Sequence, residues 1–590
     1  MAASNRCPNG PEGRASWGTW LILAFAVLVA ATSVARMFFG WGPMDEGFYI
    51  AIPYRFALGA RPFVDEANLV QGFGVLLAPV VSLFMHVTGG ITGIVLFFRA
   101  MFGSLAVVSG VLAYWVSRRY LAPRFALLVA LLPAVFMPWG IPSFSYNTIG
   151  AFGLLDATLL AWLSPQLEGR NRRWAAAAAM GVFLGASVAS YPTLAPAGLG
   201  VLIWWLWISR RRQEVWMEFV LIALFALVPL AIVGNAAVQA GVDNIRRAFI
   251  FNTSVTAQGG GVGKLVGIAV ATRVLILKSP MWVAALVVVA CRRWLERTRY
   301  GRVVAVLGLI AVPLCLAFIA EPNVYARANV IMLFWAGSGF VLIATSRRPR
   351  PLASVWVGVE LISLLGAALY AYSSNNGLLN AGVGVLPACV LGSIAFTLEG
   401  LRLTAAADGG DGEWSLVAAA PAATIVLAVV VAQLFGVYGE TVPISEMRTP
   451  IVSGAYAGII TSSENVALAA TLSADIGSVS RPGEGILFFN GFPGGYLLSA
   501  LVPWADTVWS GAPPIVPGAP ASDLWRFYER DLLQHYERTG RWPDVIVKMN
   551  LYDYPASYGP QHPVISWLAA EGYKPVVLRS DYTIYRRDAR

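Results

Sequence analysis

The sequence predicts a mainly α-helical polytopic membrane protein, with about 13 transmembrane helices and a C-terminal exported α/β domain. Three observations predict this class. Hydrophobic residues make up 57% of the 590 residues and charged residues only 13%, whereas a soluble protein of this length carries far more charge. Long apolar stretches alternate with arginine clusters up to residue 437. After that residue the composition becomes that of a soluble domain.

The arginine clusters set the expected topology. Cytoplasmic loops are enriched in Lys and Arg, so we assign five clusters to the cytoplasm, and the apolar stretches between them become out-and-back pairs. The clusters are Arg118, Arg119 and Arg124; Arg170, Arg172 and Arg173; Arg210, Arg211 and Arg212; Arg292, Arg293, Arg297, Arg299 and Arg302; and Arg347, Arg348 and Arg350. The paired spans lie near 122–139, 148–164, 175–190, 194–208, 217–236, 279–291, 302–320, 329–345, 351–372 and 381–400, and a last span near 415–437. This places the multi-pass domain, residues 1–437, in the plasma membrane with its N-terminus in the cytoplasm.

Two large external loops are expected, at 40–92 and 238–278. Within the first, residues 74–87 are interpreted as a helix at the membrane surface, too short to cross. A span there would put "SRRYLAPR" outside, so 93–116 becomes the second span. In the second loop, "KLVGIAVATRVLIL" is either a short span or an interfacial helix.

Residues 438–590 are expected to form the extracytoplasmic α/β domain. "TSSENVALAATLSADIG" predicts a helix with Ser or Thr available as its cap, and "GILFFN", "DVIVKM", "KPVVL" and "YTIYRR" predict short strands. His535 and His562 have no cysteine partner, so we expect each to be a surface histidine.

The first external loop holds polar residues that the fold alone does not require. Asp45 and Glu46 come directly after the first apolar run, beside aromatic residues, and Asp65 and Glu66 form a second acidic pair. Acids at the end of a span often only mark where water begins. A carboxylate in such a place can also act as a general base toward a hydroxyl within hydrogen-bond reach, and we favour that interpretation for the first pair.

The stretch "MDEGFYIAIPYRFALGARPFVDEANLVQGFGVLLAPV" resembles the first external loop of the GT-C glycosyltransferases. The likeness is greatest to the branch of protein O-mannosyltransferases and aminoarabinose transferases (glycosyltransferase family 39-like). It rests on the acidic pair, the turn "GARPF" and Arg99 in "LFFRAMFGSLAVV", and covers about 40–120. The resemblance implies inverting transfer of a sugar from a polyprenyl-phosphate donor. It also implies that Asp45 is the base and that Glu46 positions groups or pairs with Arg99.

The sequence departs from the family pattern at a later span. Where those enzymes often place a second acid, this chain has Tyr146 and Asn147, and Asp156 lies more than two turns deeper, where we expect it to face the bundle interior. Asn147 can bind sugar hydroxyls but cannot act as a base. For Asp65 and Glu66 three alternatives stay open: binding the acceptor, binding a cation, or capping the interfacial helix.

A departing polyprenyl phosphate needs cationic partners, and the external basic residues are the candidates. They are Arg246, Arg247, Lys264, Arg273, Lys278 and Arg327. Contact with lipid headgroups is the alternative for each of them. "TAQGGGVGK" lacks the Gly-Lys-Ser/Thr ending of a phosphate loop and is rejected as one.

We therefore expect a membrane glycosyltransferase of the bacterial cell envelope that takes a polyprenyl-phosphate-linked sugar, hexosyl or pentosyl, to a glycan, lipid or protein acceptor. The partners are this donor, the acceptor and membrane lipids, with no nucleic acid. No cofactor is required by the sequence, and the use of a divalent cation stays open. The alternatives are a transporter or flippase, or a polymerase or ligase, of lipid-linked glycans.

Overall fold

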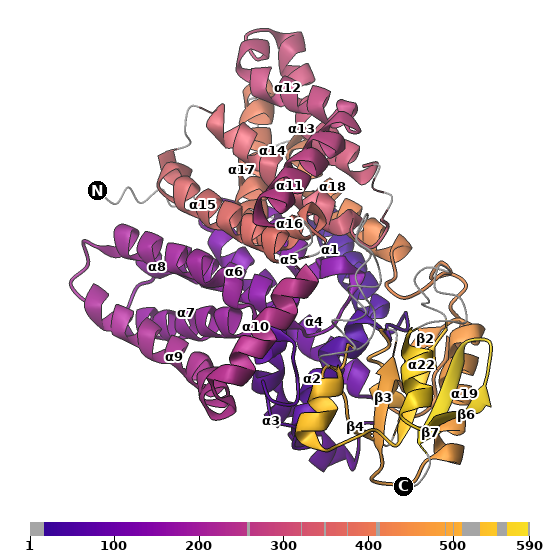
Figure 1. The fold of residues 1–590 in the computed structure, drawn as a ribbon. Helices are drawn as coiled ribbons and strands as arrows, with labels where there is room; N and C mark the ends of the chain where they lie inside the picture. The colour runs from indigo at the N-terminus through magenta and orange to yellow at the C-terminus, as the bar shows by residue number, and fades with distance from the viewer. Residues whose placement is uncertain are drawn as a thin grey trace.

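The structure is a computed structural model, shown in Figure 1. It describes residues 17–256, 260–319, 321, 323–346, 350–374, 376–408, 414–489, 491–499, 501–509, 532–550 and 563–587. Long helices form a bundle, and a small mixed sheet with its own helices lies beside one end of that bundle (Figure 1). The predicted class, a mainly α polytopic membrane protein with a C-terminal α/β unit, is confirmed.

The helices between residues 17 and 435, α2 aside, follow one another along the chain and are apolar except for the amphipathic α10. They are α1 (Trp17–Arg36), α3 (Gly72–Thr88), α4 (Ile94–Ser117), α5 (Pro123–Val135), α6 (Tyr146–Leu163), α7 (Arg170–Ser190), α8 (Ala195–Ser209), α9 (Val215–Ala240), α10 (Val242–Thr256), α11 (Gly260–Leu277), α12 (Pro280–Leu295), α13 (Arg299–Ala317), α14 (Arg327–Ala344), α15 (Arg350–Ser373), α16 (Leu378–Gly384), α17 (Leu386–Asp408) and α18 (Trp414–Phe435). In the described part of the chain, 12 helices are long and apolar enough to cross a membrane. The number is 13 if α11 and α12, bent by 83°, count as one span.

The predicted lengths of one interfacial helix and one span are wrong. Residues 69–88 are long enough to cross, because a 3₁₀ turn (Leu69–Gln71) runs on into α3, whereas 74–87 was expected to be too short. The predicted span at 122–139 is instead the 13-residue helix α5, too short to cross at 1.5 Å per residue. Its chain turns at Trp139, a residue with positive φ, whose backbone N–H donates to Asn329 and whose indole donates to Asn380.

The C-terminal unit contains a five-stranded sheet in the order β4-β3-β5-β7-β6, and a separate β1-β2 pair. The strands are β1 (Thr449–Pro450), β2 (Ile460–Thr461), β3 (Gly485–Phe489), β4 (Val502–Pro503), β5 (Val545–Met549), β6 (Tyr573–Leu578) and β7 (Tyr582–Arg587), with helices α19 (Ser463–Val479), α20 (Gly495–Leu498) and α22 (Pro563–Ala570). The predicted helix and all four predicted strands are confirmed. β3 and β5 pair in parallel and are buried along their whole length, which explains why their sequences are apolar apart from Lys548 in β5.

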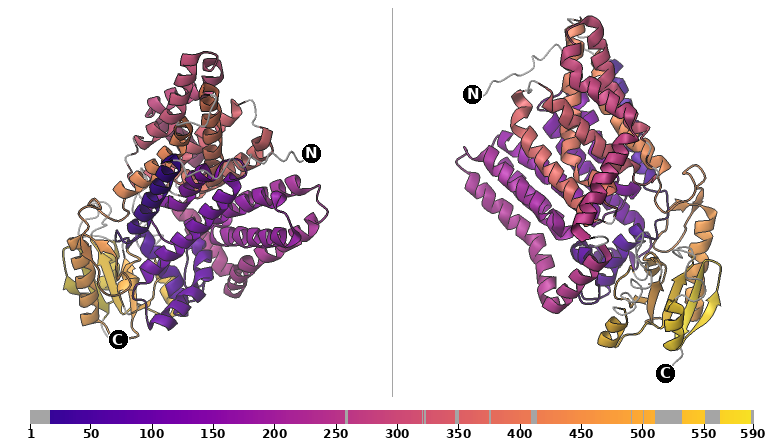
Figure 2. Two further views of the ribbon diagram at one scale, coloured as in Figure 1. Left: turned by 180° about the vertical axis from the view of Figure 1, so that it is seen from behind. Right: turned by 45° about the horizontal axis from the view of Figure 1, so that its top comes forward.

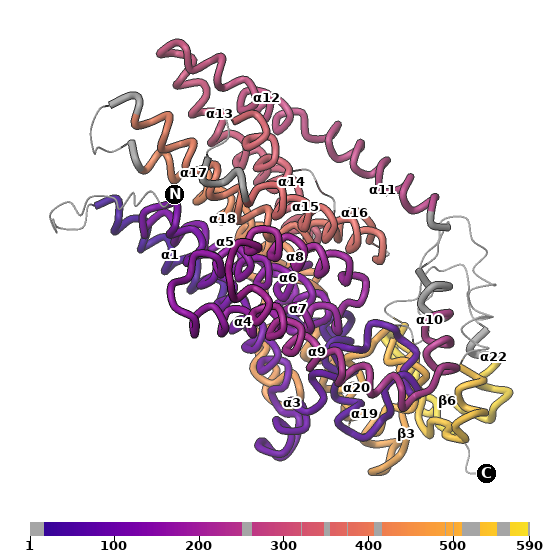
Figure 3. The backbone as a smooth tube through the Cα atoms, turned by 90° about the vertical axis from the view of Figure 1, so that its left-hand side faces the viewer, coloured from indigo at the N-terminus to yellow at the C-terminus, as the bar shows by residue number. Residues whose placement is uncertain are grey.

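The sheet unit and the first loop share one apolar core. This core joins α2 (Asp45–Ala57), α3 and the start of α4 to β3, β5, α19 and β7. A second, larger core fills the helical bundle. Figure 2 shows the sheet unit lying against one side of the bundle, and Figure 3 shows the sheet and α10 at the same end of the long helices. We call this the Asp45 end of the bundle, because α2 begins there.

Candidate functional site

Asp45 and Glu46 form the first turn of α2, where carboxylates interact favourably with the helix dipole. The turn is packed tightly against the C-terminal unit. A Cβ added at Gly47 would lie 2.5 Å from the backbone nitrogen of Gly494, and that N–H donates to the carbonyl of Pro43 at 2.7 Å. The first turn of α2 is therefore fixed against the segment that follows β3.

Glu46 forms a buried, bidentate ion pair with Arg99, the partner that the resemblance implied. Arg99 Nε donates to Glu46 Oε1 at 2.7 Å and Nη2 to Oε2 at 2.6 Å. The guanidinium also donates to the carbonyls of Met37, Phe39 and Gly40 at the end of α1. Because all these donors are occupied, Glu46 and Arg99 hold α1, α2 and α4 together and have no free face for a ligand.

Asp45 is bonded differently. Its carboxylate accepts a hydrogen bond from the hydroxyl of Tyr438, which comes directly after α18, and among the described residues it has no basic partner. The side chain is partly exposed. Desolvation of the carboxylate by the protein packed around it raises the pKa of Asp45 to about 7. The ring of Tyr438 lies 5.2 Å from that of Tyr325, just before α14. Asp45 therefore combines access, an orienting donor and a pKa near neutrality.

A cluster of aromatic rings lies beside Asp45. The ring of Tyr49, one helical turn along α2, lies 5.6 Å from that of Tyr146, which stacks on Tyr191 at 5.6 Å. Phe48 contacts both Tyr146 and Trp509 of the C-terminal unit, edge to face. Such rigid aromatic faces are suited to contact with the apolar faces of a sugar or with a lipid chain.

Tyr146 and Asn147 begin α6, and a capping box fixes their position. Ser145 accepts from the backbone N–H of Thr148, and the Ser145 N–H donates to the Thr148 hydroxyl at 2.7 Å. Asn147 Nδ2 reaches the hydroxyl of Tyr49 at 3.5 Å, and its Oδ1 is buried with no hydrogen-bond donor among the described residues. Tyr146 interacts electrostatically with Asp45, and Asn147 is connected to the same group through Tyr49. Asp156, deeper in α6, is fully buried in the bundle, as expected.

Each residue of the second acidic pair forms an ion pair with an arginine. Asp65 pairs with Arg61 at 3.2 Å, and these hydrogen bonds outweigh partial burial, so the pKa of Asp65 is lowered. Glu66 is fully buried, pairs with Arg55 at 3.1 Å and accepts from the backbone N–H of Val508 at 3.0 Å. This pair connects the first loop to the C-terminal unit.

The capping role considered for Asp65 and Glu66 belongs to another residue. Asn68 precedes the 3₁₀ turn with an extended backbone, and its Oδ1 accepts from the N–H of Val70 at 3.0 Å. His535 also differs from its prediction. It is buried against the first loop, and burial together with Arg55 lowers its pKa to about 3. His562 lies outside the described residues.

Of the predicted basic residues, Arg327 is connected to the Asp45 group through Tyr325, whose ring contacts that of Tyr438. It begins α14, two residues after Tyr325, and its buried Nε has no acceptor among the described residues. Arg247 instead donates to the carbonyl of Val64 at 2.8 Å, and Lys264 lies 5.8 Å from the ring centre of Tyr372. The remaining three are exposed and are not brought into hydrogen bonds with Asp45 or Glu46 in the described structure: Arg246, Arg273 and Lys278.

Sequence reasoning missed Tyr438 and Glu440. Glu440 Oε1 accepts from the backbone N–H of Trp41 at 2.6 Å, so the segment after the last span is bonded to the segment after the first. The available signal was positional: both residues follow the last apolar run closely, as Asp45 follows the first. Among the described residues, no group of three or more His, Cys, Asp or Glu side chains could hold a metal ion.

The solved structures that are similar to this chain include two different proteins. The archaeal oligosaccharyltransferase AglB from Archaeoglobus fulgidus, in complex with an inhibitory peptide and a dolichol-phosphate, is 14% identical; 95% of this chain and 73% of that chain are covered, with a TM-score of 0.46. ArnT from Cupriavidus metallidurans bound to undecaprenyl phosphate is 14% identical, with 97% and 98% of the chains covered and a TM-score of 0.44.

No family model and no curated protein sequence matches the chain.

Proposed function

We propose that this protein is a membrane glycosyltransferase that moves a sugar from a polyprenyl-phosphate donor to a hydroxyl of an envelope glycan, lipid or protein on the extracytoplasmic face, with Asp45 as general base. The observation that carries the proposal is the bonding of the acidic residues. Three of the four acids in the two pairs are paired with arginines, and Asp45 alone is left partly exposed with only a tyrosine donor.

A general base works best when its pKa lies near the working pH, because it is then ionised yet still basic. The pKa of Asp45, raised to about 7, meets that requirement. In the proposed step Asp45 takes the proton of the acceptor hydroxyl. The acceptor oxygen forms a bond to the anomeric carbon as the bond from that carbon to the phosphate oxygen breaks, and the single displacement inverts the configuration.

The leaving phosphate gains negative charge during this step, which a nearby cation stabilises. Arg327 is our candidate for that role, since its guanidinium is not consumed by a carboxylate in the described structure and α14 begins beside Tyr325. The aromatic rings of Phe48, Tyr49 and Tyr146 form the wall against which the sugar would pack.

The test is transfer from a panel of radiolabelled polyprenyl-phosphate sugars by the purified protein and its variants. Asp45→Asn keeps an acceptor for Tyr438 but removes the base, so its rate should fall by about 10²–10⁴-fold. Asp65→Asn is the matched control, the same change in the same loop. Its transfer rate should stay within about threefold of the wild type, because the charge that it removes pairs with Arg61, whose side chain is exposed.

Equal rates for Asp45→Asn and the wild type would overturn the base assignment. If the protein turns over no donor and instead moves lipid-linked glycan across vesicles, the transport alternative holds. Folding is checked separately. Because the pKa of Asp45 is raised in the folded state, ionising this carboxyl destabilises the fold, and the free energy of unfolding falls as pH rises through about 7. Asn has no such charge, so Asp45→Asn should unfold at an equal or higher temperature than the wild type at pH 8.

A further inference from the structure

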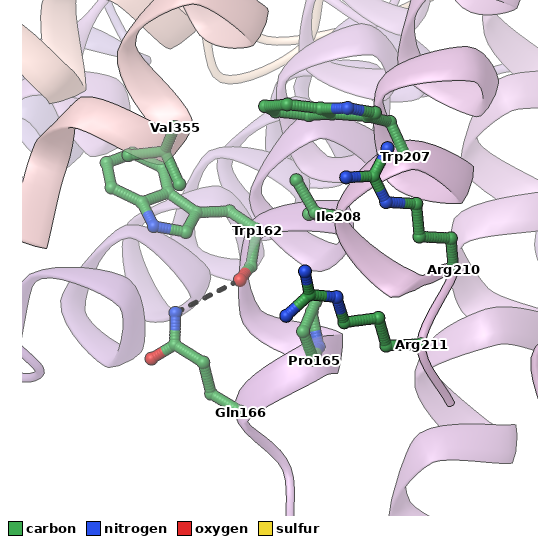
Figure 4. Close-up of a pocket in the computed structure, with 8 residues that line it drawn as sticks. All are labelled: Trp162, Pro165, Gln166, Trp207, Ile208, Arg210, Arg211 and Val355. Carbon is green, nitrogen blue, oxygen red and sulfur yellow. Dashed lines mark hydrogen bonds between the residues drawn. The ribbon is translucent and has the colours of Figure 1, made fainter. Parts of the chain in front are cut away.

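A cavity of about 380 Å³ lies at the end of the bundle opposite Asp45, between α6, α8 and α15 (Figure 4). Its volume falls in the range of about 300–1,000 Å³ usual for small-molecule sites. The residues that line it are Trp162, Pro165, Gln166, Trp207, Ile208, Arg210, Arg211 and Val355. Its walls are thus aromatic and aliphatic, and its mouth carries two adjacent guanidinium groups.

The two arginines at the mouth are available to an anion. Arg210 and Arg211 are exposed, directed along the cavity in Figure 4, and form no ion pair with any described carboxylate. The guanidinium carbon of Arg210 lies 5.7 Å from the centre of the Trp207 ring. Adjacent guanidinium groups with free donors are well suited to a phosphate.

The neighbouring glutamates form ion pairs with other arginines and not with Arg210 or Arg211 in the described structure. Glu218 is fully buried and binds Arg212 at 2.8 Å and Arg173 at 3.1 Å, and Glu214 binds Arg173 at 2.7 Å. Arg212 and Arg173 therefore use up the carboxylates at this end of α9. The positive charge of Arg210 and Arg211 is left facing the cavity.

Above the cavity, α8 presents an apolar stripe to the surroundings. Leu199, Ile203 and Trp207 are spaced four residues apart, so they share one face, and they are 57%, 59% and 50% exposed. In a membrane protein such a face contacts lipid chains, and tryptophan is enriched at the level of the headgroups. The stripe runs from Trp207, at the cavity, toward the middle of the helix.

We propose that this cavity binds an anionic phospholipid of the surrounding membrane, with its phosphate between Arg210 and Arg211 and its acyl chains along the exposed face of α8. The positive charge of Arg210 and Arg211 favours an anionic headgroup. The exposed apolar face of α8 continues from the cavity and can contact acyl chains, so a lipid should bind better than a free phosphate ion. Basic pockets between membrane helices are known to take such headgroups. The site is at the far end of the bundle from Asp45, so the proposal does not depend on the transferase function.

The test uses the full-length protein in a neutral detergent, with lipid binding measured by the rise in unfolding temperature on titration. The probes are dioctanoyl phosphatidylglycerol, dioctanoyl phosphatidylcholine and inorganic phosphate. For the wild type we expect saturable stabilisation by phosphatidylglycerol at concentrations where the other two have no effect. Equal stabilisation by phosphatidylcholine, or by inorganic phosphate, would overturn the proposal of an anionic lipid.

Variants locate the site. R210Q/R211Q should weaken the apparent affinity for phosphatidylglycerol by at least about tenfold, and R210K/R211K, which keeps the charge, should weaken it less. The matched control is R118Q/R119Q, an adjacent exposed pair after α4 at the same end of the bundle, in which Arg118 lies over Tyr114 as Arg210 lies over Trp207. An equal loss in both double glutamine variants, or no loss in R210Q/R211Q, would contradict the assignment. The replaced arginines are exposed and form no ion pair with a carboxylate of the described residues, so these changes leave the packed core intact.

Discussion

The two Asp-Glu pairs of the first loop have the same sequence and different environments. Glu46 and Glu66 are alike: each is buried and each holds an arginine, Arg99 or Arg55. The aspartates differ, because Asp65 is paired with Arg61 and has a lowered pKa, whereas Asp45 has only Tyr438 and a pKa raised to about 7. An acidic dipeptide is therefore not itself a functional signal; what distinguishes the pairs is which carboxylate is left without a cation.

The largest effect on stability is expected where a glutamate of these pairs loses its arginine. Arg99→Ala removes the bidentate partner of Glu46 and the donors to three carbonyls at the end of α1. The buried carboxylate left behind should cost about 3–5 kcal/mol of stability. Thermal unfolding in detergent measures this, with the exposed Arg119→Gln as the control; a shift no larger than that of the control would show that the pair is not structural.

A smaller effect is expected at the second pair. Glu66→Gln keeps an acceptor for Val508 but leaves Arg55 with a neutral partner, so the contact between the first loop and the C-terminal unit should weaken by about 1–3 kcal/mol. Limited proteolysis should then cleave the chain between α18 and β3 faster than in the wild type. Unchanged protection would contradict the role of Glu66 in holding this unit.

Tyr438→Phe tests the aspartate that has no cation. A hydroxyl that donates to a carboxylate favours its ionised form, so losing it should raise the pKa of Asp45 further and move the acidic limb of the activity profile up by about 0.5–1 pH unit. Tyr325→Phe is the control, since that hydroxyl donates to the backbone carbonyl of Glu440. If the acidic limb of the activity profile moves equally in both variants, or in neither, the hydroxyl of Tyr438 does not control the pKa of Asp45.

The smallest effect is expected at Asp65. The Asp65 side chain is 11% exposed, but that of its partner Arg61 is 65% exposed and solvated, so the pair contributes only about 1 kcal/mol. Asp65→Asn should therefore shift the unfolding temperature by only a few degrees and leave transfer nearly unchanged. A loss of transfer comparable to that of Asp45→Asn would mean that the two aspartates are equivalent after all.

The sequence predicted the features that depend on local pattern. The helix α19 and the strands β3, β5, β6 and β7 follow from apolar periodicity and turn residues, and the Glu46–Arg99 pair follows from the resemblance of the first loop. The features that depend on distant contacts were not predictable in this way. Tyr438 and Asp45 are 393 positions apart in the sequence. The core shared by the first loop and the C-terminal unit also joins residues that are hundreds of positions apart.

The errors have physical causes too. The chain turns after α5 at Trp139, whose backbone N–H and indole donate to Asn329 and Asn380, 190 and 241 positions further along the chain. Apolar length alone predicted a span there. His535 was expected at the surface because a lone histidine usually is; its burial results from the contact between the C-terminal unit and the first loop, which no local pattern indicates.

The most direct test of the account is the pH dependence of kcat/KM for sugar transfer by the wild-type protein. Only the ionised carboxylate can accept the proton of the acceptor, so kcat/KM should rise as pH increases and reach half of its maximum near pH 7, where Asp45 titrates. Any residual activity of Asp45→Asn should lack this limb. A wild-type profile that is flat between about pH 5.5 and 8, or whose limb lies near the ordinary carboxyl pKa of about 4, would contradict the claim that Asp45 is the base.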